Sequence, residues 1–229
     1  MIYPNLVRPQ EVKTWIFDLD NTLYPVTKRL LALIDQQMGS FVANYLEISR
    51  EEAHKVQKSY FKKYGLTLRG LMLNDGLDPA KYFEEMTPMD LKEVSPNPIL
   101  VDTISRLRGR KIIYTNASAR HAKLVLKRIG FNPNDFEAIF DIEAANYIPK
   151  PAIESYQLLC EQHSIEPKKS AMVDDIVQNL LPASKMGMLT IWKKSSAEWA
   201  KNIKVENYIN YVVEDLEEWF QCLQKSLLE

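Results

Sequence analysis

Two acidic residues, Asp18 and Asp20, stand two positions apart directly after a short apolar run. If that run is a strand, residues two apart point to the same side, so both carboxylates can face one ligand. Two close carboxylates repel each other unless a cation lies between them. Such a pair suits Mg²⁺, a hard ion that takes oxygen ligands and often shares them with a substrate phosphate. A pair of acids that only caps a strand is the alternative reading.

A second pair of acids, Asp174 and Asp175, ends another apolar run and is followed by Asn179. In a parallel α/β sheet the two runs would end at the same edge, where such sheets bind ligands. Two acid pairs at one edge are electrostatically costly without a metal ion. The two pairs together therefore favour a cation site.

Thr115 and Asn116 end the apolar run KIIYT, and Ser118 follows at the start of a helical pattern. Backbone N–H groups and a hydroxyl at a helix start can hold phosphate oxygens, although an ordinary helix cap is the simpler reading. Lys150 stands between two prolines, which restrict the backbone and can aim its ammonium group. A lone surface lysine is the alternative for this residue.

The whole set has the parts of a site for phosphoryl chemistry. It offers a nucleophilic carboxylate, a second carboxylate able to trade a proton, a cation site, and donors for phosphoryl oxygens. No single pattern is specific for this chemistry, but the ordered set is.

The elements that must position these residues follow from the hydrophobic pattern. The segment TWIFDLDNTLYP at 14–25 predicts a buried strand that feeds a loop. From about residue 30 to 93 the spacing is that of amphipathic helices, with Gly65 at a helix end. The Pro-rich SPNPIL at 95–100 predicts a hinge, and a helix through DTISRLR then opens an alternation of strand and helix patterns.

This alternation predicts an α/β fold with a doubly wound parallel sheet and an inserted all-helical segment. The expected division is an α/β core of residues 1–23 and 96–229 and a helical insertion of residues 24–95. The insertion would follow the first strand, directly after the first pair of acids.

Composition narrows the class of partner. The 229 residues include 29 basic and 30 acidic side chains, a net charge of −1, without a long block of one sign. This balance argues against a nucleic-acid polymer as partner. No stretch is apolar for long enough to cross a bilayer and no signal peptide is recognised, so we expect no membrane partner and a cytoplasmic protein. A monomer and a homodimer both remain open.

The motifs resemble those of the haloacid dehalogenase superfamily. The four matching segments are DLDNT at 18–22, YTNAS at 114–118, the lysine of IPKP at 148–151, and VDDIVQN at 173–179. The match spans essentially the whole α/β core, and implies a Rossmann-like core with a small helical cap inserted after the first motif.

The resemblance also implies roles for the residues. Asp18 would be the nucleophile and a magnesium ligand. Asp20 would be the acid and base that protonates the leaving oxygen and then activates water, and would bind magnesium through its backbone carbonyl. The phosphoryl group would be held by Thr115 and Lys150, with Asn116 beside them. Asp175 would complete the magnesium site, with Asp174 assisting and Asn179 in support.

Asp20 also separates subfamilies. Hydrolysis of a phosphate ester requires protonation of the leaving group, whereas the dehalogenase branch has no acid at this position. The resemblance therefore argues against cleavage of a carbon–halogen bond.

Within and beside the cap, the segments DNTLYP, YGLTLRGL at 64–71, HAKLVLKRIG and PKPA resemble the pyrimidine 5′-nucleotidase branch, which hydrolyses UMP and CMP. In that reading Tyr64, Thr67 and Arg69, in a glycine-flanked loop, are candidates for contact with the part of the substrate that is not phosphate. The alternative is that Gly65 and Gly70 only bound a turn between two helices.

The function predicted from the sequence is thus a magnesium-dependent phosphatase of a small phosphomonoester, with UMP and CMP as the expected substrates. A phosphatase of another metabolite and a phosphomutase are alternatives; a mutase would return the phosphoryl group to another hydroxyl. A non-catalytic phosphate-sensing module is the alternative of another class, and the inserted cap and the acid pair after Lys150 argue against it.

Overall fold

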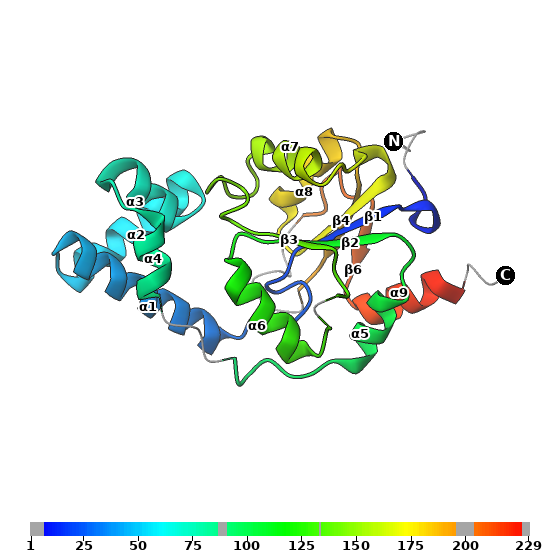
Figure 1. Cartoon of the computed structure of the whole chain (residues 1–229), viewed down its shortest axis with the longest axis horizontal. Helices are drawn as coiled ribbons and strands as arrows, with labels where there is room; N and C mark the ends of the chain where they lie inside the picture. Colours follow the sequence, from blue (N-terminus) through cyan, green and yellow to red (C-terminus); the bar gives the residue numbers. More distant parts are fainter. Residues whose placement is uncertain (1–6, 87–90, 133, 196–203, 226–229) are drawn as a thin grey trace.

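A six-stranded sheet forms the centre of the larger part of the molecule, and a group of four helices stands beside it (Figure 1). The computed structural model describes residues 7–86, 91–132, 134–195 and 204–225. The strand order is β3-β2-β1-β4-β5-β6, and all neighbouring strands are parallel. The strands are β1 Thr14–Phe17, β2 Arg110–Tyr114, β3 Ala138–Phe140, β4 Ser170–Asp174, β5 Leu189–Lys193 and β6 Tyr211–Val213.

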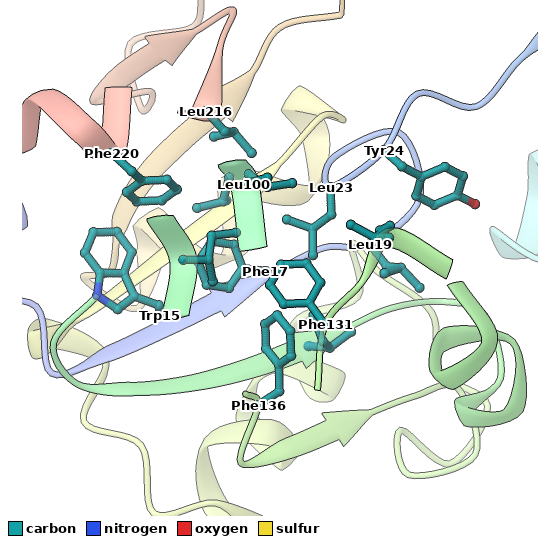
Figure 2. Packing of buried hydrophobic residues seen from close by; sticks show 14 of the residues in the cluster. Trp15, Phe17, Leu19, Leu23, Tyr24, Leu100, Phe131, Phe136, Leu216 and Phe220 are labelled. Carbon is teal, nitrogen blue, oxygen red and sulfur yellow. The ribbon is translucent and has the colours of Figure 1, made fainter. Parts of the chain in front are cut away.

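Strand β1 lies in the middle of the sheet, and its side chains are buried on both faces. Trp15 and Phe17 belong to the hydrophobic cluster on one face, while Ile16 belongs to the cluster on the other. Figure 2 shows Trp15 and Phe17 packed with Phe220 and Phe136 on the first face. Apolar residues on both sides are typical of a strand covered by helices on both faces.

The chain winds from β1 outward through β2 and β3, and then returns to build β4, β5 and β6 on the other side of β1. Helices α5, α6 and α9 cover one face and helices α7 and α8 the other (Figure 1). The predicted doubly wound parallel sheet is therefore confirmed. The helix bounds are α5 Pro98–Ser105, α6 Ala119–Ile129, α7 Ile153–Gln162, α8 Val177–Lys185 and α9 Leu216–Lys225, with 3₁₀ turns at Pro9–Glu11 and Pro167–Lys169.

Helix α5 begins earlier than the predicted DTISRLR helix. Its first residue is Pro98, inside the segment that the sequence predicts as a hinge. The side chain of Asn97 caps this helix by accepting a hydrogen bond from the Leu100 N–H at 3.1 Å. Proline fits the first helical position because its missing N–H has no helical partner there, so a Pro-rich segment starts a helix as readily as it bends a chain.

The stretch predicted to be helical forms four helices, which we call the helical group: α1 Lys28–Leu46, α2 Arg50–Tyr64, α3 Thr67–Asp75 and α4 Pro79–Glu85. They share a hydrophobic cluster that includes Phe41, Val42, Leu71 and Tyr82. Gly65 ends α2 with a φ of 79°, as predicted. The division into domains at residues 24–95 stays a prediction, and residues 87–90 at its far end lie outside the described part.

One local prediction is wrong. Arg69 does not lie in a loop, because α3 continues through Gly70 to Asp75. Gly70 serves packing: a Cβ atom at this position would lie 2.3 Å from Cγ of Tyr60 on the neighbouring helix α2. The glycine therefore permits close contact between two helices and does not end one.

Within the described ranges, no helix has both the length and the apolar character that crossing a bilayer requires.

Candidate active site

The register of the sheet brings the predicted residues to one edge. Phe17 at the end of β1 pairs with Ile113 of β2 and with Val173 of β4. The next residues in the three strands are Asp18, Tyr114 and Asp174, and the Asp18 N–H donates to the Val173 carbonyl at 2.9 Å. The acids that follow β1 and β4 therefore meet at the carboxyl edge, where parallel sheets of this kind bind ligands.

Lys150 reaches this edge from the segment before α7. Its Nζ lies 2.7 Å from Oδ1 of Asp18 and 2.7 Å from Oδ2 of Asp174, and it donates to the Tyr114 carbonyl at 3.0 Å. The residue is only 3% exposed, so the surface-lysine reading does not hold. Burial would lower the pKa of the ammonium group, but the charges of Asp174 and Asp18 hold the pKa above its ordinary value. Lys150 therefore stays charged between two carboxylates.

Asn116 fixes the backbone of Lys150. Its Oδ1 accepts from the Lys150 N–H at 2.8 Å, and its Nδ2 donates to the Lys150 carbonyl at 3.3 Å. The sequence predicts Asn116 as a phosphate-binding residue. In the structure, the oxygen and the nitrogen of its side-chain amide both bond to the backbone of Lys150. Ser118 caps α6, since its Oγ accepts from the His121 N–H at 3.3 Å.

The second acid pair is held by two asparagines. Asn179 donates to both oxygens of Asp174, at 3.0 and 3.1 Å. Asn21 donates to Oδ2 of Asp175 at 2.7 Å. Asp174 is fully buried and Asp175 is 6% exposed, so both carboxylates need donors; Asn179 adds to the contact of Asp174 with Lys150, and Asn21 serves Asp175.

The acids fit a divalent cation. Three carboxylate oxygens, one from each of Asp18, Asp174 and Asp175, lie within 4.8 Å of one another. Burial, opposed by Lys150 and reinforced by Asp174, raises the pKa of Asp18 to about 8. Burial and the charge of Asp174 raise the pKa of Asp175 to about 6. One ammonium group thus offsets the three buried carboxylates incompletely, and a hard cation bound by oxygen ligands would supply the missing charge.

Asp20 lies beside this cluster and has partners of its own. The Tyr24 hydroxyl donates to Oδ1 of Asp20 at 2.5 Å, and Nε2 of His121 lies 2.9 Å from the same oxygen. The other oxygen lies 3.5 Å from Oγ1 of Thr115. Burial would raise the pKa of Asp20, but the hydrogen bonds with His121 and Tyr24 hold it below its ordinary value. Asp20 is thus ordered, and one of its oxygens faces Thr115.

His121 and Tyr24 were not among the residues predicted from the sequence. Their positions carry a usable signal: Tyr24 follows Asp20 by four residues in the same turn, and His121 lies in the first turn of α6. A polar residue in the first turn of a helix that follows a strand end lies near the ligand edge. Thr22 is a further partner, since its hydroxyl donates to Oδ2 of Asp18 at 2.7 Å.

A cavity of about 530 Å³ adjoins Asp20, between the helical group and the start of α6. Of the three residues proposed for substrate contact, Thr67 lines this cavity, and its hydroxyl donates to the Gln57 carbonyl at 3.2 Å. Tyr64 donates to Asn74 within the helical group. Arg69 donates from Nη1 to the Tyr147 carbonyl at 2.9 Å, which links the helical group to the core.

Comparisons with known proteins agree with this architecture. The family described as haloacid dehalogenase-like hydrolase matches residues 12–187. The glyceraldehyde 3-phosphate phosphatase of Pyrococcus furiosus is 20% identical over 240 residues, covering 95% of each chain. Phosphate metabolism protein 8 of Saccharomyces cerevisiae is 26% identical over 204 residues; the match covers 81% of this chain, which spans 63% of that relative's length.

A solved structure shares the fold. The L-2-haloacid dehalogenase from Xanthobacter autotrophicus, with chloropropionic acid covalently bound, superposes with a TM-score of 0.58 at 16% sequence identity. The match covers 93% of this chain and 98% of that one. At this identity the likeness concerns the fold alone.

Proposed function

The chain belongs to the haloacid dehalogenase-like hydrolase family, and on that premise we propose that it is a phosphatase acting on a small phosphomonoester through a phospho-aspartyl intermediate on Asp18. The observation that carries this proposal is the ordered carboxyl group of Asp20 beside Thr115. A halide leaves without a proton, whereas the alkoxide of a phosphate ester needs one. The name of the Pyrococcus furiosus relative, a phosphatase, points the same way.

The first step is attack on phosphorus. A carboxylate oxygen of Asp18 forms a bond to phosphorus while the bond from phosphorus to the ester oxygen breaks. In the substrate complex the negative charge of the nearby phosphoryl group opposes the effect of His121 and Tyr24 and raises the pKa of Asp20. Asp20 then takes up a proton from solvent and gives it to the ester oxygen, which leaves as an alcohol. Thr115 and Lys150 are the candidates for binding the phosphoryl oxygens, with the Lys150 ammonium 2.7 Å from Oδ1 of the nucleophile.

The second step hydrolyses the phospho-aspartyl intermediate and regenerates the free enzyme. Asp20, now a carboxylate, takes a proton from water, whose oxygen attacks phosphorus and displaces Asp18. Inorganic phosphate leaves, and both carboxyl groups regain their starting states. The helical group would act as the cap, closing over the substrate during attack and opening for product release.

A magnesium ion is part of the proposal. Asp18 and Asp175 would hold it through carboxylate oxygens and Asp20 through its backbone carbonyl, with Asp174 in support. When bound, Mg²⁺ offsets negative charge on the phosphoryl oxygens. The support for this ion is the incomplete neutralisation of buried carboxylates by Lys150.

We further propose pyrimidine nucleoside monophosphates, UMP and CMP, as the substrates. The resemblance of the cap segments to the pyrimidine 5′-nucleotidase branch supports this, and the cavity beside Asp20 is within the size range of small-molecule sites. A small phosphorylated carbohydrate is the second candidate, because one relative acts on glyceraldehyde 3-phosphate by name. Phosphate release measured across nucleotides, sugar phosphates and triose phosphates separates the two.

The reaction itself is tested with a generic aryl phosphate. Wild-type protein with Mg²⁺ should release phosphate, and both Asp18→Asn and chelation of the metal should abolish the release. With Asp20→Asn the phospho-enzyme should form slowly and then persist, because the hydrolytic water has lost its base. Stable phosphorylation of the wild-type protein without turnover would favour a sensing module, and transfer to a second hydroxyl without free phosphate would favour a mutase.

A further inference from the structure

The cavity beside Asp20 is lined mainly by apolar side chains, together with several polar ones. Most of its lining is apolar and comes from both the helical group and the core, including Ile34, Met38, Leu66, Phe83 and Leu124. Its volume of about 530 Å³ exceeds what a three-carbon leaving group would fill. Hydroxyl groups of a polyhydroxylated leaving group that met this apolar part of the lining would lack hydrogen-bond partners there. The lining therefore suits a ring-shaped, largely apolar body.

Aromatic side chains extend this preference. Tyr82 and Phe83 of α4 both line the cavity, and their ring centroids lie 5.2 Å apart. A planar ring can stack on or meet the edge of such side chains with a favourable quadrupole contact. The apolar part of the leaving group is therefore expected to be planar.

One residue of the lining, Gln37, has a side-chain polar atom without a partner in the described part of the chain. Oε1 of Gln37, on α1, is buried and has no hydrogen-bond partner among the described residues. A buried acceptor that stays unpaired is unfavourable, and native proteins usually satisfy such a group with a protein donor, a water or a ligand. The neighbouring Gln36 is exposed, so the two glutamines form a matched pair in one helix.

From these observations we infer that Gln37 determines leaving-group specificity: its side-chain amide turns so that the unpaired Oε1 faces the cavity and accepts a hydrogen bond from a ring N–H or amino N–H of a heterocyclic base. The inference rests on the proposed function, since it names the feature of the leaving group that the same site recognises. The base lies among the apolar and aromatic side chains, and the ester oxygen faces Asp20, which lines the same cavity.

The chemistry of an amide explains how one residue accepts two bases. A glutamine side chain carries one acceptor oxygen and one NH₂ donor, and a half turn about its last bond exchanges them. Uracil presents a ring N–H flanked by carbonyl oxygens, and cytosine presents an amino group beside an unprotonated ring nitrogen. Gln37 can therefore pair with either edge, so UMP and CMP should be used with similar efficiency.

The test compares substrates and variants in one assay of kcat/KM with the magnesium-loaded enzyme. The substrates are UMP, its 3-methyl derivative without the N–H, its 5-methyl derivative with the N–H, and ribose 5-phosphate without a base. For the wild type, methylation at N3 should lower kcat/KM by roughly 10- to 100-fold, and methylation at C5 by less than about threefold. The 5-methyl compound controls for the size of the added group.

The variants locate the effect. In Gln37→Met the loss of kcat/KM on N3 methylation should shrink to within about threefold. The acceptor for the N3 hydrogen is already gone in this variant, so removing that hydrogen from the substrate costs little more. Gln36→Met should keep the wild-type penalty. If N3 and C5 methylation cost the same in the wild type, or if Gln37→Met keeps the full penalty, the inference is wrong. The wild-type comparison stands even if Gln37→Met does not fold.

Failure of the proposed function has a different signature. In that case no phosphate is released from any of these compounds or from a generic aryl phosphate. Turnover of the aryl phosphate with equal use of UMP and ribose 5-phosphate would contradict only the role of Gln37.

Discussion

Asp20 receives both of its closest side-chain contacts on one oxygen. The Tyr24 hydroxyl and Nε2 of His121 meet Oδ1, which leaves Oδ2 toward Thr115. A carboxyl group fixed in this way presents a defined oxygen to the reacting ester and then to water. Because the proposed mechanism uses Asp20 in both steps, a loss of its orientation should slow both.

His121 is therefore predicted to be a positioning residue. His121→Phe should lower kcat for an aryl phosphate by about 10- to 100-fold while KM changes little, since the phosphoryl contacts remain. His121→Gln, whose amide can reach the same carboxylate, should recover part of the loss. Quenched-flow measurement of phospho-enzyme formation and decay checks that both steps slow together.

A purely structural role for His121 would give another pattern. Both variants would then lose thermal stability and active fraction in parallel, and kcat per active site would stay at the wild-type value. That outcome would remove His121 from the mechanism.

The sequence predicts the residues at strand ends well and those reached through helices poorly. Asp18 and Asp174 converge because parallel strands end at one edge, so identifying the strands was enough to bring them together. The contact of His121 with Asp20 depends on the direction in which α6 leaves the sheet, which no local pattern encodes. Arg69 was misplaced for a related reason: Gly70 reads locally as a turn, whereas its contact with Tyr60 comes from another helix.

At the scale of the element, Gly70 is a packing residue of the α2–α3 pair. An alanine would gain about 1 kcal/mol of helix propensity. Its Cβ, however, would lie 2.3 Å from Cγ of Tyr60, so the two helices would have to separate. We expect Gly70→Ala to lower the free energy of unfolding by about 1–3 kcal/mol, measured by urea titration.

Gly39, inside α1, is the matched control. A Cβ atom there would meet only Oε1 of Gln57, at 3.3 Å, which is the far end of a side chain. Gly39→Ala should therefore change stability by less than about 1 kcal/mol. Equal effects of the two substitutions would contradict the packing role of Gly70.

Three contacts join the helical group to the segment that carries Lys150. Arg69 donates to the Tyr147 carbonyl, the Tyr147 ring stacks on Phe83 at 6.4 Å, and Pro149 lies against Gly65. These contacts suit a link that holds the helical group against the core, and they differ from the substrate contact that the sequence suggests for Arg69.

Arg69→Ala should accordingly weaken closure of the helical group against the core and leave the selectivity between substrates unchanged. We expect KM to rise by about 3- to 10-fold for UMP and for ribose 5-phosphate alike, because both need the closed state. Tyr64→Phe, which loses only the bond to Asn74 inside the helical group, should leave both values unchanged. A loss confined to UMP after Arg69→Ala would restore Arg69 as a contact to the base.

At the scale of the whole molecule, the sheet edge concentrates negative charge that the fold must tolerate. Lys150 bridges Asp18 and Asp174, while Asp175 relies on the Asn21 amide. Burying charges without full compensation destabilises a protein, and a ligand that binds only the folded state stabilises it. The stability of the whole chain should therefore depend on divalent cations, whether or not substrate is present.

The expected size follows from mass action. Mg²⁺ at 100 times its Kd stabilises the folded state by about 2.7 kcal/mol. For a chain of this length the corresponding rise in Tm is about 5–10 °C, measured by calorimetry with Mg²⁺ against a chelator. Asp175→Asn should raise Tm in the chelator, because one buried negative charge is gone, and should reduce the Mg²⁺-dependent rise by at least about half. Exposed Glu161→Gln, on α7, should leave both values as in the wild type. An identical Tm with Mg²⁺ and with chelator would mean that the three carboxylates do not form a cation site.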